Sequence, residues 1–140
     1  MPRPLVLGRI VWAEIADPNG IRKNRPAVIV TPTGRIAPGG SLEVVAVTSR
    51  LPKRLPDDHV PLPSHAQGHP RTMLNRRCAA VCTWIARIRE EDIQDVGGLV
   101  PSPAMVSILA KVTALQAPPD AERKDEESPE QADSLPSNDT

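Results

Sequence analysis

Residues 42–48, Leu-Glu-Val-Val-Ala-Val-Thr, give the strongest β-strand signal in the chain. The segment is rich in β-branched side chains, which fit the pleated, extended backbone of a sheet. A Gly- and Pro-rich stretch at 33–40 precedes it, and a loop at 50–58 follows it. A strand bounded by turn chemistry on both sides is typical of an all-β domain.

Shorter apolar segments repeat this pattern, which predicts further strands. They lie at residues 8–15, 27–30 and 59–62. The first should stop at the turn sequence Asp-Pro-Asn-Gly at 17–20. The second lies between Pro26 and Pro32, neither of which can donate to a central ladder. Since Pro61 lies within the third, we expect that strand at a sheet edge.

The segment Cys78–Arg89 fits two kinds of element. Its apolar residues follow a helical stripe, but they also alternate as a strand would, so periodicity leaves both open. The following segment is clearer, because Ser102 suits a helix N-cap and Pro103 the first helical position. The apolar face of that helix would consist of Met105, Ile108, Leu109, Val112 and Leu115. The prediction is a mainly β domain, a small, strongly bent sheet or barrel with one C-terminal helix.

The 140 residues carry a formal net charge of zero, but the charge is uneven. Residues 117–140 contain eight acidic and two basic residues, a net of −6, so residues 1–116 carry +6. We expect one domain at 1–116 that attracts an anionic partner. The composition of 117–140 predicts a disordered acidic tail. That tail either only keeps the chain soluble or transiently covers the basic domain.

Several classes of protein are excluded by composition. No uncharged apolar stretch approaches the roughly 18 residues of a membrane helix, and the first residues do not form a signal peptide. Cys78 and Cys82 are four residues apart without a second ligand pair, so neither a disulfide framework nor a zinc site is expected. The expected location is the cytoplasm, with no membrane partner.

Familiar catalytic motifs are missing from the sequence. No nucleophile elbow, phosphate loop or dinucleotide fingerprint is found. His59, His65 and His69 lack an accompanying carboxylate cluster, so neither metal binding nor acid–base catalysis is assigned to them. The two aromatic residues, Trp12 and Trp84, are expected to pack in a core or interface. A nucleic acid would therefore be held mainly through its phosphates.

Polar residues gather where two predicted strands meet a loop. Arg22, Lys23 and Arg25 lead into the second strand, and Thr48, Ser49 and Arg50 follow the third; Lys53 and Arg54 lie in the next loop. If the two strands are antiparallel neighbours, Arg25 and Thr48 share one surface. A guanidinium matches two phosphate oxygens and a threonine hydroxyl can donate to a third. Taken alone, this pattern also fits a solvated loop arginine and a β-branched filler.

At these residues the chain resembles the MazF/PemK family of toxins from bacterial toxin–antitoxin systems. The resemblance covers roughly residues 8–116. The matching pieces are Gly-Arg-Ile-Val-Trp-Ala-Glu-Ile at 8–15, Asp17-Pro18, Arg-Pro-Ala-Val-Ile-Val-Thr-Pro at 25–32, Val-Ala-Val-Thr-Ser at 45–49, His-Val-Pro-Leu at 59–62 and the strand around Val81-Cys82.

The resemblance implies an SH3-like barrel that forms a homodimer, with Cys78–Arg89 as a strand. It also implies a metal-independent, sequence-selective endoribonuclease without a cofactor, which cleaves single-stranded RNA and is neutralised by an antitoxin protein. The family's catalytic arginine falls on Arg25 and its threonine on Thr48. Arg22, Lys23, Ser49, Arg50, Lys53 and Arg54 would then contact RNA.

The chain departs from the family pattern at two places. Only six residues, 19–24, separate Asp17-Pro18 from Arg25-Pro26, where relatives have a longer loop. An aspartate that assists proton transfer in some members is missing near Thr83. These departures also suit a binding module on the same barrel, as in a gyrase poison that cuts nothing, or a DNA-binding or other nucleic-acid-binding domain without a toxic role.

Overall fold

The computed structural model describes residues 3–116, with side chains described as far as residue 114. It contains six strands, two short 3-10 helices and one α-helix. The strands are β1 (Arg9–Ala16), β2 (Arg22–Ile29), β3 (Ser41–Thr48), β4 (His59–Leu62), β5 (Cys78–Arg89) and β6 (Ile93–Leu99). The helices are η1 (Thr33–Arg35), η2 (Glu90–Asp92) and α1 (Ser102–Gln116).

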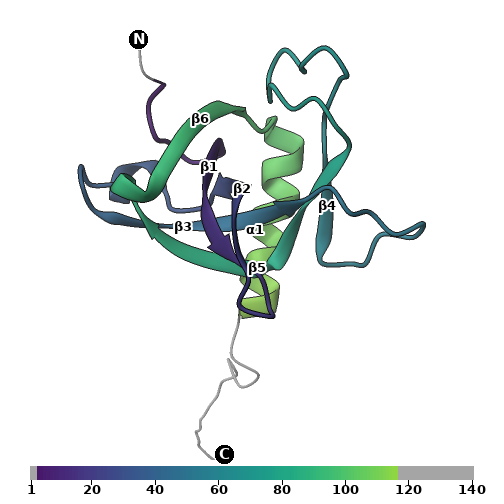
Figure 1. Cartoon of the computed structure of the whole chain (residues 1–140), viewed down its shortest axis with the longest axis horizontal. Coiled ribbons are helices and arrows are strands. Elements are labelled where there is room, and N and C mark those ends of the chain that lie inside the picture. The colour runs from purple at the N-terminus through teal and green to yellow at the C-terminus, as the bar shows by residue number, and fades with distance from the viewer. Residues whose placement is uncertain (1–2, 117–140) are drawn as a thin grey trace, which may run out of the picture.

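The six strands form one antiparallel sheet in the order β4-β5-β3-β2-β1-β6. Figure 1 shows that the sheet is strongly curved, with β5 and β6 sweeping around β1 and β2. Within the described residues the sheet does not close, because β4 and β6 each pair with one strand only. The predicted fold class, a small bent β-sheet with a C-terminal helix, is confirmed.

Both faces of the curved sheet are buried, because alternate residues of a strand point to opposite sides. On β2, Val28 belongs to the core that α1 covers, where Met105 and Ile108 are buried. Its neighbours Ala27 and Ile29 belong to a second core, which partly includes Trp84. The N-terminal end of β2 and the C-terminal end of β3 extend past both cores. They carry the polar residues Arg22, Lys23, Arg25 and Thr48.

The sequence prediction was wrong about the start of β2. The strand begins at Arg22 and not at Ala27, so Pro26 lies inside it and pairs with Trp12 of β1. The ladder between β2 and β3 reaches only Ala27, which pairs with Ala46. Pro26 is tolerated because the ladder to β3 has already ended there. The strand β6 was not predicted, since its Gly97-Gly98 pair weakens any strand pattern.

The other elements agree closely with the sequence. Cys78–Arg89 is a strand, and His59–Leu62 is an edge strand that contains Pro61. The helix α1 begins one residue earlier than expected: the amide of Met105 donates to the carbonyl of Pro101 (3.0 Å), so Pro101 and not Ser102 occupies the cap position. The predicted apolar stripe packs on the first core, except that the side chain of Leu115 is outside the described part.

No helix between residues 3 and 116 is long and apolar enough to cross a membrane. The predicted acidic tail, residues 117–140, lies outside the described residues.

Candidate functional site

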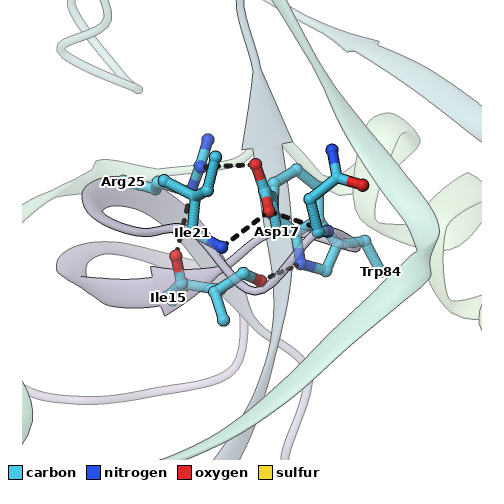
Figure 2. Close-up of polar contacts among 7 residues, drawn as sticks. Ile15, Asp17, Ile21, Arg25 and Trp84 are labelled. Carbon is cyan, nitrogen blue, oxygen red and sulfur yellow. Dashed lines mark hydrogen bonds and ion pairs between the residues drawn. The ribbon is translucent and has the colours of Figure 1, made fainter.

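Arg25 is held by three contacts at the start of β2. Its Nε donates to the carbonyl of Ile15 (3.1 Å), its Nη2 lies 3.7 Å from a carboxylate oxygen of Asp17, and its guanidinium carbon lies 4.9 Å from the ring centroid of Trp84. Figure 2 shows these residues gathered around the turn between β1 and β2. With its side chain only 20% exposed, Arg25 is fixed rather than free in solvent.

The groups that hold Arg25 are themselves held. Oδ1 of Asp17 accepts the backbone amides of Asn19 and Ile21, both at 2.9 Å, as in an Asx turn. The indole Nε1 of Trp84 donates to the carbonyl of Ala16 (3.0 Å) and so joins β5 to the same turn. Each contact fixes the guanidinium plane before any ligand arrives. The Nη1 of Arg25 has no partner within residues 3–116 and can donate to one.

Thr48 ends β3 on the strand next to Arg25. Since Ala27 pairs with Ala46, continuing this antiparallel register by two residues places Arg25 opposite Thr48, although the ladder itself has ended. The hydroxyl oxygen of Thr48 accepts the amide of Arg50 (3.1 Å). The hydroxyl proton of Thr48 is therefore free to be donated to a ligand.

Arg25 and Thr48 line one cavity of about 630 Å³ at this end of the sheet. The lining is strongly basic, because it includes five positively charged side chains and one carboxylate. They are Arg3, Lys23, Arg25, Arg50 and Arg76, opposed by Asp95. An anion entering this cavity meets a positive potential on several sides.

The structure brings together some of the residues that the sequence singled out and leaves others apart. Lys23, Ser49 and Arg50 line the cavity with Arg25 and Thr48. Arg22 does not, since its Nε pairs with Glu14 on the surface (3.3 Å). Lys53 and Arg54 are exposed in the following loop and are not part of the lining.

Sequence reasoning missed a second group of lining residues, which comes from the N-terminal segment, β1, the loop 63–77 and β6. It includes Arg3, Trp12, Met73, Asn75, Arg76 and Asp95. The pair Arg76-Arg77 before β5 was a visible charge signal. Arg3 and Asp95 carried no signal, because only the pairing of β1 with β6 brings them to this end of the sheet.

A second groove, of about 450 Å³, is lined by Trp84, which does not line the first, and it has a different charge. Its charged lining residues are Glu14, Asp17, Arg22, Arg87 and Asp92. Acidic residues outnumber basic ones there, so this groove does not attract an anion as the first does. Of the two grooves, the basic cavity is the candidate functional site.

The histidines play structural parts. Nδ1 of His65 accepts the amide of Gln67 (3.0 Å), and Nδ1 of His69 accepts the amide of Arg71 (3.1 Å), so both order the loop 63–77. His59 does have a carboxylate partner, Asp58, at 2.7 Å, which the sequence analysis did not foresee. Within residues 3–116 no group of three or more His, Cys, Asp or Glu side chains is placed to hold a metal ion.

Asp58 joins β4 to the middle of β5. Its second carboxylate oxygen accepts the hydroxyl of Thr83 (2.6 Å), and its carbonyl accepts the amide of Cys82 (2.7 Å). The hydrogen bond from Thr83, together with that from His59, lowers the pKa of Asp58 below its ordinary value. Burial raises the pKa of the Cys78 thiol to about 11, so Cys78 is an inert core residue although it borders the cavity.

Comparison with known proteins gives one family. The sequence model described as "PemK-like, MazF-like toxin of type II toxin-antitoxin system" matches residues 7–115. A comparison with curated proteins finds no significant match.

Solved structures with a similar fold include MazF toxins and a mycobacterial endoribonuclease. A crystal structure of MazF from Deinococcus radiodurans superposes with a TM-score of 0.65 at 19% identity, covering 81% of this chain and 97% of the other. The Mycobacterium tuberculosis toxin MazF-mt6 gives 0.56 at 16% identity, with 76% and 93% covered. A mycobacterial endoribonuclease in complex with its cognate antitoxin gives 0.61 at 16% identity, with 82% and 98% covered.

Proposed function

Because the chain belongs to the PemK-like, MazF-like family of type II toxin–antitoxin toxins, we propose that it is an endoribonuclease that cleaves single-stranded RNA without a metal ion. The fixed guanidinium of Arg25 and the free hydroxyl proton of Thr48, on two residues that both line the basic cavity, carry this proposal. Similar solved structures named as endoribonucleases support it.

The proposed reaction is an attack of a ribose 2′-oxygen on the adjacent phosphorus. The new P–O2′ bond forms while the P–O5′ bond breaks, which leaves a 2′,3′-cyclic phosphate and a 5′-hydroxyl. The 2′-hydroxyl gives its proton to a water molecule, and the departing 5′-oxygen takes up one proton to become the 5′-hydroxyl. The phosphorane between these steps carries extra negative charge on its oxygens.

Arg25 and Thr48 suit the two needs of that transition state. The guanidinium of Arg25 would stabilise the added charge through Nη1 and help to protonate the leaving oxygen, and the hydroxyl of Thr48 would donate to a phosphate oxygen. Because Ile15, Asp17 and Trp84 already fix the guanidinium, little reorganisation is needed when charge develops.

Ser49 and the remaining basic residues would hold the RNA strand. Lys23, Ser49 and Arg50 line the cavity and are placed for phosphates next to the scissile one. We assign Arg22, Lys53 and Arg54 to nucleotides further along the strand, because they lie outside the lining. The predicted domain 1–116 contains all of these groups, so removing residues 117–140 should leave cleavage in place.

We further propose that the protein forms a homodimer in the cytoplasm and that an antitoxin protein neutralises it. The comparison structures include MazE–MazF complexes and an endoribonuclease with its cognate antitoxin, which supports an antitoxin partner.

Cleavage in EDTA tests the proposed function. The purified protein should cleave single-stranded RNA and leave a 5′-hydroxyl, and Arg25→Ala should lower the rate by about 100-fold or more, as removal of one transition-state donor does. Thr48→Val conserves the shape and removes only the hydroxyl, so a rate loss with an unchanged melting temperature separates chemistry from folding. Arg87→Ala is the matched control, since Arg87 is an exposed arginine outside the cavity.

Equal cleavage by Arg25→Ala and the unmodified protein would overturn the catalytic assignment. A protein that binds RNA without cutting it would then be the non-catalytic module considered from the sequence, and a DNA gyrase supercoiling assay would test its gyrase-poison form.

A further inference from the structure

Met73 combines two features that folded chains usually avoid. Its φ is 64°, which makes it the one non-glycine residue with a positive φ among residues 3–116. Its side chain is also 47% exposed. A left-handed backbone is strained for a residue with a Cβ, and strain of this kind persists where the surrounding structure enforces it.

The surroundings of Met73 do enforce it. The buried hydroxyl of Thr72 donates to the carbonyl of Pro63 (2.8 Å) and accepts the amide of Leu74 (3.1 Å). The amide of Met73 donates to the carbonyl of His69 (2.8 Å). The loop 63–77 thus holds Met73 in one place, with its thioether side chain turned out of the core.

β6 fixes the same loop from the other side. The amide of Leu99 donates to the carbonyl of Arg71 (2.8 Å), and the backbone of Gly98 lies so close that a Cβ there would overlap Arg71 and Thr72. Because the loop 63–77 and β6 together fix its backbone, the exposed Met73 has a defined position in the cavity wall.

Trp12 lines the same cavity as Met73. Its side chain is half-buried, and its indole N–H has no partner within the part of the chain that the structure describes. The two large side chains therefore contribute apolar surface to a cavity whose lining is otherwise rich in basic residues. Polar side chains that both donate and accept hydrogen bonds, Asn24 and Asn75, complete the lining beside the carboxylate of Asp95.

We propose that Trp12 and Met73 form a subsite for one unpaired nucleobase of the RNA strand, next to the phosphate that Arg25 and Thr48 contact. This inference rests on the proposed function, which supplies RNA as the ligand, and it names the residues that select the base. A flat aromatic base suits an indole and a polarisable thioether, and the basic residues of the lining suit the phosphates on either side of that base.

The amides of Asn24 and Asn75 and the carboxylate of Asp95 would read the edge of the base. Amide groups offer both donors and acceptors, and a carboxylate accepts from the exocyclic amino groups of bases. We therefore expect discrimination at the one nucleotide whose base this subsite holds.

A binding experiment that separates bases from backbone tests the subsite. The probes are short single-stranded 2′-O-methyl RNAs of mixed sequence, which lack the attacking hydroxyl, and matched abasic strands with the same backbone. The unmodified protein should bind the base-containing strands about 5- to 150-fold more tightly than the abasic ones, as expected for one stacked base.

Met73→Gly is the decisive variant, because it removes the side chain and relieves the positive φ at the same time. We expect an unchanged or higher melting temperature together with a lost preference for base-containing strands, a combination that damage to the fold does not produce. Trp12→Leu should lower the same preference. Val106→Ala, which truncates an exposed apolar side chain outside the cavity, should leave it unchanged.

The proposal is wrong if abasic strands bind as tightly as base-containing ones, or if Met73→Gly leaves their ratio unchanged. Cleavage of unmodified RNA is scored separately. Cleavage without a base preference would overturn the subsite alone, whereas a base preference without cleavage would overturn the nuclease and retain the subsite.

Discussion

Trp84 lies on β5 and Trp12 on β1, and their surroundings differ. Trp84 donates its indole N–H to Ala16 and places its ring against Arg25, which is also bonded to Ile15 and paired with Asp17. Trp12 stands in the wall of the basic cavity, and its indole N–H has no partner within residues 3–116. One tryptophan is engaged within the protein, whereas the other is open to a ligand.

The difference matches two demands of a site that binds and cuts. A group that stabilises a transition state must be fixed beforehand, because reorganisation during the reaction costs rate. A group that recognises a base must instead present free surface and unpaired hydrogen-bonding groups. The surroundings of Trp84 meet the first demand and those of Trp12 and Met73 meet the second. Changes on the two sides should therefore have different consequences.

The largest effect is expected at Gly98, on the Trp12 side. A Cβ there would overlap the backbone of Arg71 and Thr72, and neither can move without losing the hydrogen bond that its carbonyl accepts, from Leu99 and from Gly98 respectively. Gly98→Ala should lower the free energy of unfolding by about 3 kcal/mol in a urea titration, at the upper end for overpacking. Gly97→Ala is the matched control, since its nearest contact would be an ordinary 3.4 Å.

Gly98→Ala should also displace Met73 and weaken the preference for base-containing RNA, while Trp84 keeps its contacts. An equal loss of stability from both glycine variants would show that the loop 63–77 is not fixed against β6.

Trp84→Leu is expected to have an intermediate effect, and on catalysis. The change removes the ring under Arg25 and the indole donor to Ala16, so the guanidinium loses part of its orientation. We expect kcat for RNA cleavage to fall about 10-fold with KM little changed, in keeping with a cation–π contact of up to ~2 kcal/mol. Trp84→Phe keeps a ring and should retain most of the rate. A change confined to KM would place Trp84 in substrate binding instead.

The sequence predicted the strands that carry their own pattern and missed those that depend on partners. Residues 42–48 read clearly as a strand because β-branched residues dominate it. β6 was missed because its glycines serve a close approach to the loop 63–77, which appears only in three dimensions. The early start of β2 was missed because Pro26 normally excludes a central strand and is allowed here only past the end of a ladder.

The candidate site was predictable to a similar extent. The expected antiparallel pairing of the second and third strands was enough to predict Arg25 and Thr48 on one surface. Their neighbours in the sequence, Lys23, Ser49 and Arg50, line the same cavity. Trp84 was expected to pack, but a stack on Arg25 requires β5 and the β1–β2 turn to meet, and no local pattern encodes that meeting. The strained Met73 was equally invisible, since its conformation is imposed by Thr72 and β6.

The smallest expected effect is a pH dependence of the folding stability, which arises at Asp58 near Trp84. Thr83 and His59 hold the pKa of Asp58 below its ordinary 3.8. A lowered folded pKa means that this stabilisation is fully present above the unfolded value and is lost as the pH falls through the folded one. Acidification below about pH 4 should cost less than about 1 kcal/mol at this half-buried group. Thr83→Val should move the pKa of Asp58 back up, as a carboxyl NMR titration would measure.

Thr83, which is bonded to Asp58, directly precedes Trp84 in β5. Protonation of Asp58 should therefore alter the surroundings of Trp84 at a higher pH than those of Trp12. Two single-tryptophan proteins distinguish the sides. The fluorescence of Trp12→Phe, which reports Trp84, should change with the titration of Asp58, whereas that of Trp84→Phe, which reports Trp12, should change less. If both signals changed together and Thr83→Val altered neither, Asp58 would not be coupled to Trp84, and the two sides of the sheet would respond to acid as one unit.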